Sequence, residues 1–190
     1  MRKYLGILPL ALTLTLSGCS WEQVGHNVSA FDKVATMRFF ELYKTDIRYN
    51  DFDEDTGVRS ASRAPRMLPM RIADNDKWMD FTDDLGPKYI TFGKRIERAT
   101  FPDGLEPITE FLAWSELPAA QRLKTLEALN NREEFTSIEA RVVQERGTDE
   151  PLLVFTMSSL PFTKQPAYAL DSDNAYQMLR MATIWHKTPN

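Results

Sequence analysis

Two neighbouring segments of the sequence predict an antiparallel hairpin, and this feature constrains the fold more than any other. Apolar and charged residues alternate over Phe135 to Arg146, which is typical of a half-buried strand. Residues 152–157 are apolar at every position except Thr156 and therefore indicate a strand in the middle of a sheet. Because the turn-forming residues 147–151 separate the two segments, we expect the strands to be adjacent and antiparallel.

Helical patterns precede and follow this hairpin. Ser29 and Asp32 have the spacing of a capping box and predict a helix over 30–43, although the aromatic residues in that stretch also favour a strand starting within it. A second helix is expected after Pro118, with Leu123, Leu126 and Leu129 on one face, ending near Asn130 and Asn131. This leucine face fits a core position better than a groove for a partner.

The last helix is expected after Asp171, Ser172 or Asp173, each of which can cap its first turn. One or two strands are expected within residues 88–101, after the turn at Gly86 and Pro87. Strands and helices that do not alternate regularly indicate an α+β fold. We therefore expect residues 29–190 to form a single α+β domain, with a mostly antiparallel sheet packed by two or three helices.

The first residues of the chain have the pattern of an export signal. Arg2 and Lys3 are followed by an apolar run over residues 4–16, which is shorter than the roughly 20 residues of a membrane-spanning helix. The run ends in Leu16, Ser17, Gly18 and Cys19. An ordinary secretory signal with an unrelated cysteine nearby is the alternative interpretation.

These four residues resemble the lipobox of bacterial lipoproteins, and the resemblance covers only about the first 19 positions. It implies that residues 1–18 are a lipoprotein signal peptide, and that Cys19 carries a diacylglyceryl group and an acyl chain such as palmitate. Residues 19–28 would then be a tether to the membrane. Ser20 stands where Asp is the usual signal for retention in the inner membrane, so the resemblance favours the outer membrane, facing the periplasm. In a Gram-positive cell the same anchor would hold the domain on the outer face of the plasma membrane.

Cysteine usage and charge restrict the function further. Cys19 is the only cysteine, so without a disulfide the fold must be held by core packing. Without Arg2 and Lys3, 21 of the 23 basic residues remain against 27 acidic ones, a net charge of −6. This charge disfavours nucleic acid as a partner, because phosphate binding needs a basic face.

No motif in the sequence predicts an enzyme. The two histidines, His26 and His186, lie near opposite ends of the chain, and no zinc, nucleotide-binding or nucleophile-elbow motif occurs. Two carboxylates of a glycoside hydrolase need no fixed spacing, so a cell-envelope hydrolase is the least favoured class rather than an excluded one. We expect no catalytic residues and no cofactor other than the covalent lipid.

Two segments are candidates for binding a small ligand. Asp51, Asp53 and Asp55 bring carboxylates to alternate positions, as in loops that bind Ca²⁺, but the glycine and the final ligand of an EF-hand are misplaced. A solvated acidic turn is the simpler interpretation of this segment.

The second segment contains four arginines that could bind an anionic glycan or lipid headgroup: Arg59, Arg63, Arg66 and Arg71. The simpler interpretation is that they pair with the aspartates that flank them. The leading functional hypothesis is therefore a non-enzymatic accessory or scaffold, anchored to the membrane, that binds another envelope protein. The alternative is a lipoprotein that binds Ca²⁺ or an anionic glycan.

Overall fold

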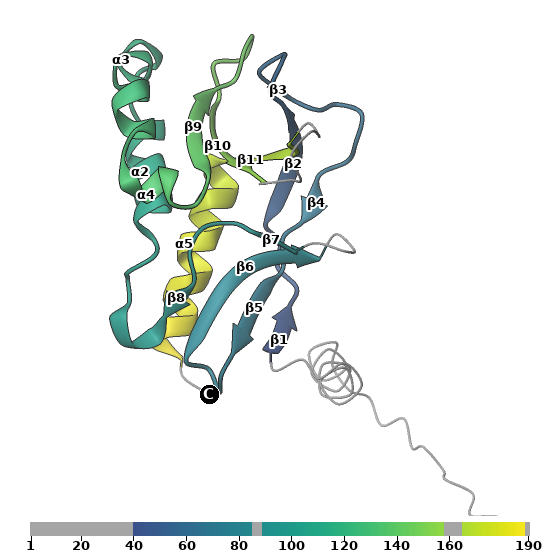
Figure 1. The fold of residues 1–190 in the computed structure, drawn as a ribbon, viewed down its shortest axis with the longest axis vertical. Helices are drawn as coiled ribbons and strands as arrows, with labels where there is room; N and C mark the ends of the chain where they lie inside the picture. Colours follow the sequence, from purple (N-terminus) through teal and green to yellow (C-terminus); the bar gives the residue numbers. More distant parts are fainter. Residues whose placement is uncertain (1–39, 85–88, 158–164, 189–190) are drawn as a thin grey trace, which may run out of the picture.

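Among the residues that the structure describes, strands dominate the first half of the domain, and helices appear only after residue 97. The computed structural model describes residues 40–84, 89–157 and 165–188, which form eleven strands and four α-helices (Figure 1). The signal peptide, Cys19 and the tether lie outside the described residues. The first eight strands are β1 (Phe40–Tyr43), β2 (Arg48–Asp53), β3 (Val58–Arg59), β4 (Arg66–Met67), β5 (Met70–Ala73), β6 (Trp78–Asp84), β7 (Tyr89–Thr91) and β8 (Ile96–Glu97).

Helices and the last three strands make up the second half. They are η1 (Arg98–Thr100), α2 (Glu106–Ser115), α3 (Ala119–Asn130), α4 (Glu133–Thr136), β9 (Ala140–Gln144), β10 (Pro151–Thr156), β11 (Ala167–Asp171) and α5 (Ser172–Lys187). Among the described residues, no helix combines the length and the apolar character needed to cross a membrane.

All strand pairs are antiparallel and belong to two sheets. The first sheet has the order β1-β5-β6-β7, with β8 also paired to β6, and the second has the order β3-β2-β11-β10-β9, with β4 also paired to β2. The predicted α+β class with antiparallel pairing is confirmed. The strands form two sheets rather than one, and there is one more helix than expected.

The chain passes between the two sheets twice at the same place. The turn from β1 to β2 and the turn from β4 to β5 lie side by side, because the buried Thr45 hydroxyl donates to Leu68 O at 2.5 Å. Leu68 N in turn donates to Ile47 O at 3.0 Å. These bonds join the sheets into one body around a shared core.

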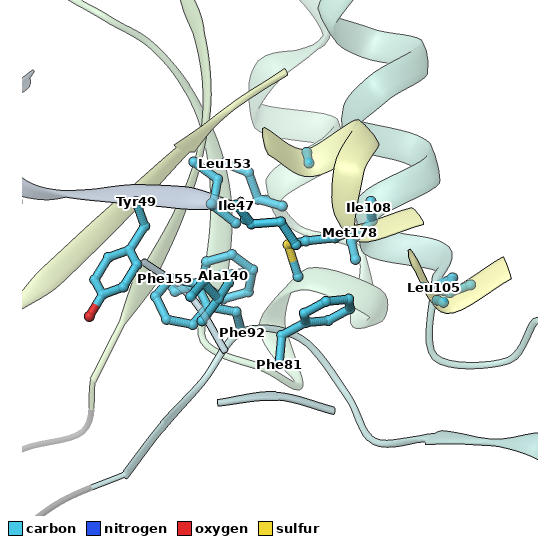
Figure 2. Close-up of a cluster of buried hydrophobic side chains, with 14 of the residues drawn as sticks. Ile47, Tyr49, Phe81, Phe92, Leu105, Ile108, Ala140, Leu153, Phe155 and Met178 are labelled. Carbon is cyan, nitrogen blue, oxygen red and sulfur yellow. The ribbon is translucent and has the colours of Figure 1, made fainter. Parts of the chain in front are cut away.

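The core lies between the two sheets and the helices. Figure 2 shows Phe81 of the first sheet, Phe155 of the second and Met178 of α5 pointing into the same cluster. Phe92, Phe111 and Leu153 are also fully buried in it. Helix α2 packs against α5, and α3 packs against β9, so the helices cover the core on the side away from β1.

The hairpin and the last helix form as predicted, with shorter strands. Strand β10 lies between β9 and β11, which explains why it is apolar on both faces. The strand predicted from Phe135 begins only at Ala140, because 133–136 forms the short helix α4 and Glu139 takes a left-handed conformation at φ 52°. Asp171 caps α5 by accepting a hydrogen bond from Asn174 N at 2.9 Å.

Three further differences concern the helices, although α3 (Ala119–Asn130) itself forms where it was predicted. The helix predicted over 30–43 falls mostly outside the described residues, and its last four residues are strand β1, since they pair in register with β5. Helix α2 was not predicted, although Pro107 lies in its first turn. In α3, Leu126 and Leu129 pack against the core, whereas Leu123 is 61% exposed.

Candidate functional site

Arg59 lies where the β2 to β3 hairpin contacts the residues that follow β9, Glu145 and Arg146. We call this contact, which closes the second sheet on itself, the seam. The hairpin of β2 and β3 folds towards the end of β9, where Arg146 N donates to Gly57 O at 3.1 Å. Arg59 N donates to Glu145 Oε1 at 2.8 Å, and its guanidinium donates to Glu145 Oε2 at 2.8 Å and to Glu150. Figure 1 shows the two hairpins next to each other at the upper end of the molecule. Strands β3 and β9, at opposite ends of the strand order, are therefore joined.

A second, smaller apolar cluster fills the space that this closure surrounds. It consists of Phe52, Leu152, Val154, Ala167 and Ala169, with Val143 packed against it. Leu152 and Val154 are fully buried, although the helices lie on the other face of the sheet. The second sheet therefore encloses a small apolar core of its own. The hydrogen bonds of Arg59 to Glu145 help to hold the sheet closed around it.

The charges in the seam stabilise each other. The hydrogen bond from Arg59 to Glu145 raises the pKa of the Arg59 guanidinium above its usual range. This increase outweighs the decrease that burial alone would cause. The same bond lowers the pKa of Glu145, whose side chain is only 6% exposed. Since Arg59 already pairs with three carboxylates of its own chain, those of Glu145, Glu150 and Asp171, it has a structural role here.

Asp51, the first predicted calcium ligand, is bound to two of the predicted anion-binding arginines. Its Oδ2 lies 3.0 Å from Arg63 NH1, and its Oδ1 pairs with Arg66. Asp53 Oδ1 accepts a hydrogen bond from Asp55 N at 3.0 Å, which shapes the turn after β2. Within the parts of the chain that the structure describes, no three His, Cys, Asp or Glu side chains gather closely enough to hold a metal ion.

Arg66 also contacts two aromatic rings next to a buried tyrosine hydroxyl. Its guanidinium carbon lies 4.9 Å from the ring centroid of Tyr49 and 5.0 Å from that of Tyr168. The Tyr49 hydroxyl donates to Asp83 Oδ2 at 2.5 Å. Burial and the neighbouring Asp83 carboxylate raise the pKa of Tyr49, so this hydroxyl stays protonated at neutral pH and works as a hydrogen-bond donor.

Arg71 lies in the other sheet and does not join the remaining three arginines. It pairs with the buried Asp80 across β5 and β6, with Nε at 2.9 Å from Oδ1. Its guanidinium carbon is 5.2 Å from the ring of Phe40 and 5.4 Å from that of Trp78. The four arginines therefore occupy three separate places, and each of them pairs with a carboxylate of this chain.

A cluster that sequence reasoning missed ties the end of α5 to the hairpin of β5 and β6. Asp76 accepts from Trp185 Nε1 at 2.5 Å and from Arg98 NH2 at 2.6 Å. Arg98 NH1 donates to His186 O at 2.8 Å, and the guanidinium carbon lies 4.2 Å from the Trp185 ring. The residues of this cluster come from three distant segments, so no local pattern connects them. The one local signal is the run Asp74, Asn75 and Asp76, because Asp and Asn favour the left-handed conformation that this turn adopts.

A cavity of about 360 Å³ opens between β7 and the end of β10. Its walls combine apolar side chains such as Ile90 and Phe155 with the hydroxyls of Thr91 and Ser137. Glu139 is the carboxylate among the described lining residues. Glycoside cleavage needs two facing carboxylates, so this lining alone does not supply that chemistry.

Comparisons with known proteins assign no family. No family model matches the chain, and no curated protein matches it either. Three solved structures show limited structural similarity. The first is SsgB of Streptomyces coelicolor, in which mutations correlate with longitudinal cell division during sporulation; it shares 9% identity over 76% of this chain and 88% of that one, with a TM-score of 0.34.

The second is an SsgA-like sporulation-specific cell division protein of Thermobifida fusca, with 12% identity over 76% of this chain and 82% of that one and a TM-score of 0.34. The third is complement regulator-acquiring surface protein 3 of Borrelia burgdorferi, with 9% identity over 72% of this chain and 94% of that one and a TM-score of 0.30. Similarity at this level does not indicate a shared function.

Proposed function

We propose that this chain is a bacterial envelope lipoprotein, anchored through Cys19, whose domain acts as a non-enzymatic accessory that binds another envelope protein. The lipobox Leu16-Ser17-Gly18-Cys19, directly behind a basic start and an apolar run, is the observation that carries the anchoring. Ser20 after the acylated cysteine supports delivery to the outer membrane, with the domain in the periplasm.

The scaffold role is supported by how the charged side chains are used. The arginines considered for ligand binding contact the carboxylates of Asp51, Asp80, Glu145 and Glu150. An anionic glycan would have to displace these contacts, and Ca²⁺ would have to displace two arginines from Asp51. Protein recognition needs no such rearrangement, so we favour it over ligand binding.

The anchoring is tested by feeding cells an alkyne-tagged fatty acid and comparing the full-length protein with its Cys19→Ala variant. We expect the unaltered protein to carry the tag and to be found in the membrane fraction. The Cys19→Ala variant should show neither property. Labelling of both proteins, or of neither, would contradict acylation at Cys19.

The partner is sought by crosslinking in living cells followed by mass spectrometry, again with Cys19→Ala as the unanchored control. One or two envelope proteins that are recovered with the anchored protein and lost with the control would support the scaffold role. If no protein is recovered above background, the scaffold role is wrong and a small ligand becomes the better hypothesis.

A further inference from the structure

The outer face of the first sheet differs from the face that points into the core. Side chains alternate along β5 and β6, so Met70, Ile72 and Met79 are buried in the core cluster. Arg71 of β5 and Trp78 of β6 are each adjacent in sequence to one of these buried residues and therefore lie on the opposite face. The core cluster, which includes the buried residues of α2 and α5, contains neither of them.

This outer face presents aromatic and aliphatic groups next to cations. Leu42 of β1 lies opposite Arg71 in register and is 43% exposed. Trp78 is half-buried, and the guanidinium carbon of the exposed Arg95 lies 4.2 Å from its ring centroid. Half-exposed tryptophan beside arginine is the side-chain chemistry of protein surfaces at the boundary between lipid and water.

The two guanidinium groups on this face differ in their partners among the described residues. Arg71 is neutralised by the buried Asp80. Arg95, in contrast, forms no ion pair with any residue that the structure describes, although Glu97 is exposed on the same strand region. Guanidinium binds phosphate through a bidentate fork, so the exposed Arg95 supplies a group that can bind a lipid phosphate.

The position of this face in the molecule matches that of the proposed anchor. β1 begins at Phe40, which follows Cys19 by 21 positions, and it is the first described strand of this sheet. Figure 1 shows the first sheet at the lower end of the molecule and α3 at the upper end. A membrane that holds Cys19 is joined to the domain through β1, so the first sheet is the closest part of the fold along the chain.

We infer that, in the anchored protein, the outer face of the first sheet lies against the phosphate headgroups of anionic phospholipids, with Arg95 bound to phosphate and Leu42 and Trp78 at the lipid boundary. This orientation rests on the proposed anchoring at Cys19. Helix α3 and the β9 to β10 hairpin lie at the opposite end of the molecule (Figure 1).

The experiment uses two exposed leucines at opposite ends of the domain. Because acylation consumes the thiol of the only cysteine, Leu42→Cys and Leu123→Cys each introduce one free thiol into the full-length lipoprotein. Each variant is labelled with a fluorophore and reconstituted in vesicles of phosphatidylethanolamine and phosphatidylglycerol that contain a headgroup spin-labelled lipid as quencher. We expect the label at position 42 to be quenched several-fold more strongly than the label at position 123.

Charge reversal tests the contact with phosphate. In the Leu42→Cys background, Arg95→Glu should remove the additional quenching, and replacement of phosphatidylglycerol by phosphatidylcholine should do the same. Arg180→Glu is the matched control, because Arg180 is an exposed arginine of α5 that donates a hydrogen bond to the side chain of Gln177. Near-ultraviolet circular dichroism confirms that each variant is folded.

The outcomes separate this inference from the anchoring itself. Protein that does not float with the vesicles would overturn the anchoring and this orientation together. Protein that floats but shows equal quenching at both positions, or stronger quenching at position 123, would overturn the orientation alone. So would a label at position 42 that is protected from reagents in cells but unquenched in vesicles, since a partner protein would then cover this face.

Discussion

The side-chain amide of Asn130 takes the place of a neighbouring strand for Val142. Asn130 Oδ1 accepts a hydrogen bond from Val142 N at 2.7 Å, and Asn130 Nδ2 donates to Val142 O at 3.0 Å. Val142 belongs to β9, the last strand in the order of the second sheet. Exposed strand edges invite pairing with other chains, and here the last residue of α3 satisfies this one.

Loss of this amide should destabilise the domain. Asn130→Ala leaves one backbone donor and one acceptor of the buried Val142 without partners, which costs about 1–3 kcal/mol. Urea denaturation followed by circular dichroism should show a lower midpoint for this variant. Asn131→Ala is the control, because Asn131 is exposed and adjacent. Equal stability of the two variants would show that the Asn130 contacts are not significant.

The seam between Arg59 and Glu145 should make stability depend on pH. The pKa of Glu145 is lowered from an ordinary value near 4.5, so its contribution is fully present above that pH and is lost as the pH falls through the lower folded-state value. Glu145→Gln should be less stable at neutral pH by about 3 kcal/mol, because Arg59 loses a buried partner.

The pH profile of this variant provides the test. Free energies of unfolding are measured from pH 7 downwards for the unaltered protein, Glu145→Gln and the exposed control Glu127→Gln. The difference caused by Glu145→Gln should shrink as the pH falls below the ordinary value near 4.5. A difference that stays constant over this range would mean that the carboxylate charge does not stabilise the seam.

Arg98 should not be replaceable by lysine. It donates to Asp76, to Asp76 O and to His186 O while stacking on Trp185, and a lysine ammonium cannot reproduce this planar set of donors. We expect Arg98→Lys to lower the free energy of unfolding by about 2 kcal/mol.

A neighbouring arginine provides the control for Arg98. Arg95→Lys changes an exposed side chain that stacks on one ring, so its effect should stay below about 1 kcal/mol. Hydrogen exchange at the last turn of α5 should increase in Arg98→Lys only. Unchanged exchange there would show that Arg98 does not hold this helix end.

Calcium should not bind to the acidic segment of β2. The carboxylate of Asp51 is held by Arg63 and Arg66, which would have to move before a cation could reach it. We expect no heat above dilution when Ca²⁺ is titrated into the folded protein in a calorimeter. A saturable signal that disappears in Asp51→Asn would overturn this expectation and restore the ligand-binding hypothesis.

Local patterns in the sequence predicted some elements because their signals are contained in a few neighbouring residues. Asp171 caps α5 from three positions away, and the hairpin of β9 and β10 follows from its alternation and its turn. Helix α2 has a local signal in Pro107, which lies in its first turn. Residues 40–43 are predicted as the end of a helix, with a strand as the alternative because of their aromatic residues, and they form the strand.

The candidate site was less predictable because its contacts join distant positions. Arg59 finds Glu145 at a separation of 86 residues, and no spacing rule connects them. The expectation that arginines pair with nearby aspartates describes Arg71 with Asp80 and Arg63 with Asp51, since both pairs lie within one stretch of strands and turns.

The position of β11 in the second sheet affects the timing of folding. Asp51 of β2 pairs with Tyr168 of β11, so this neighbour follows 117 residues later in the chain. A chain that is synthesised or threaded through a membrane from its N-terminus has released nearly all of its residues before β2 can gain this partner. Because contacts between distant residues slow folding, the second sheet should be completed only after β11 has become available to β2.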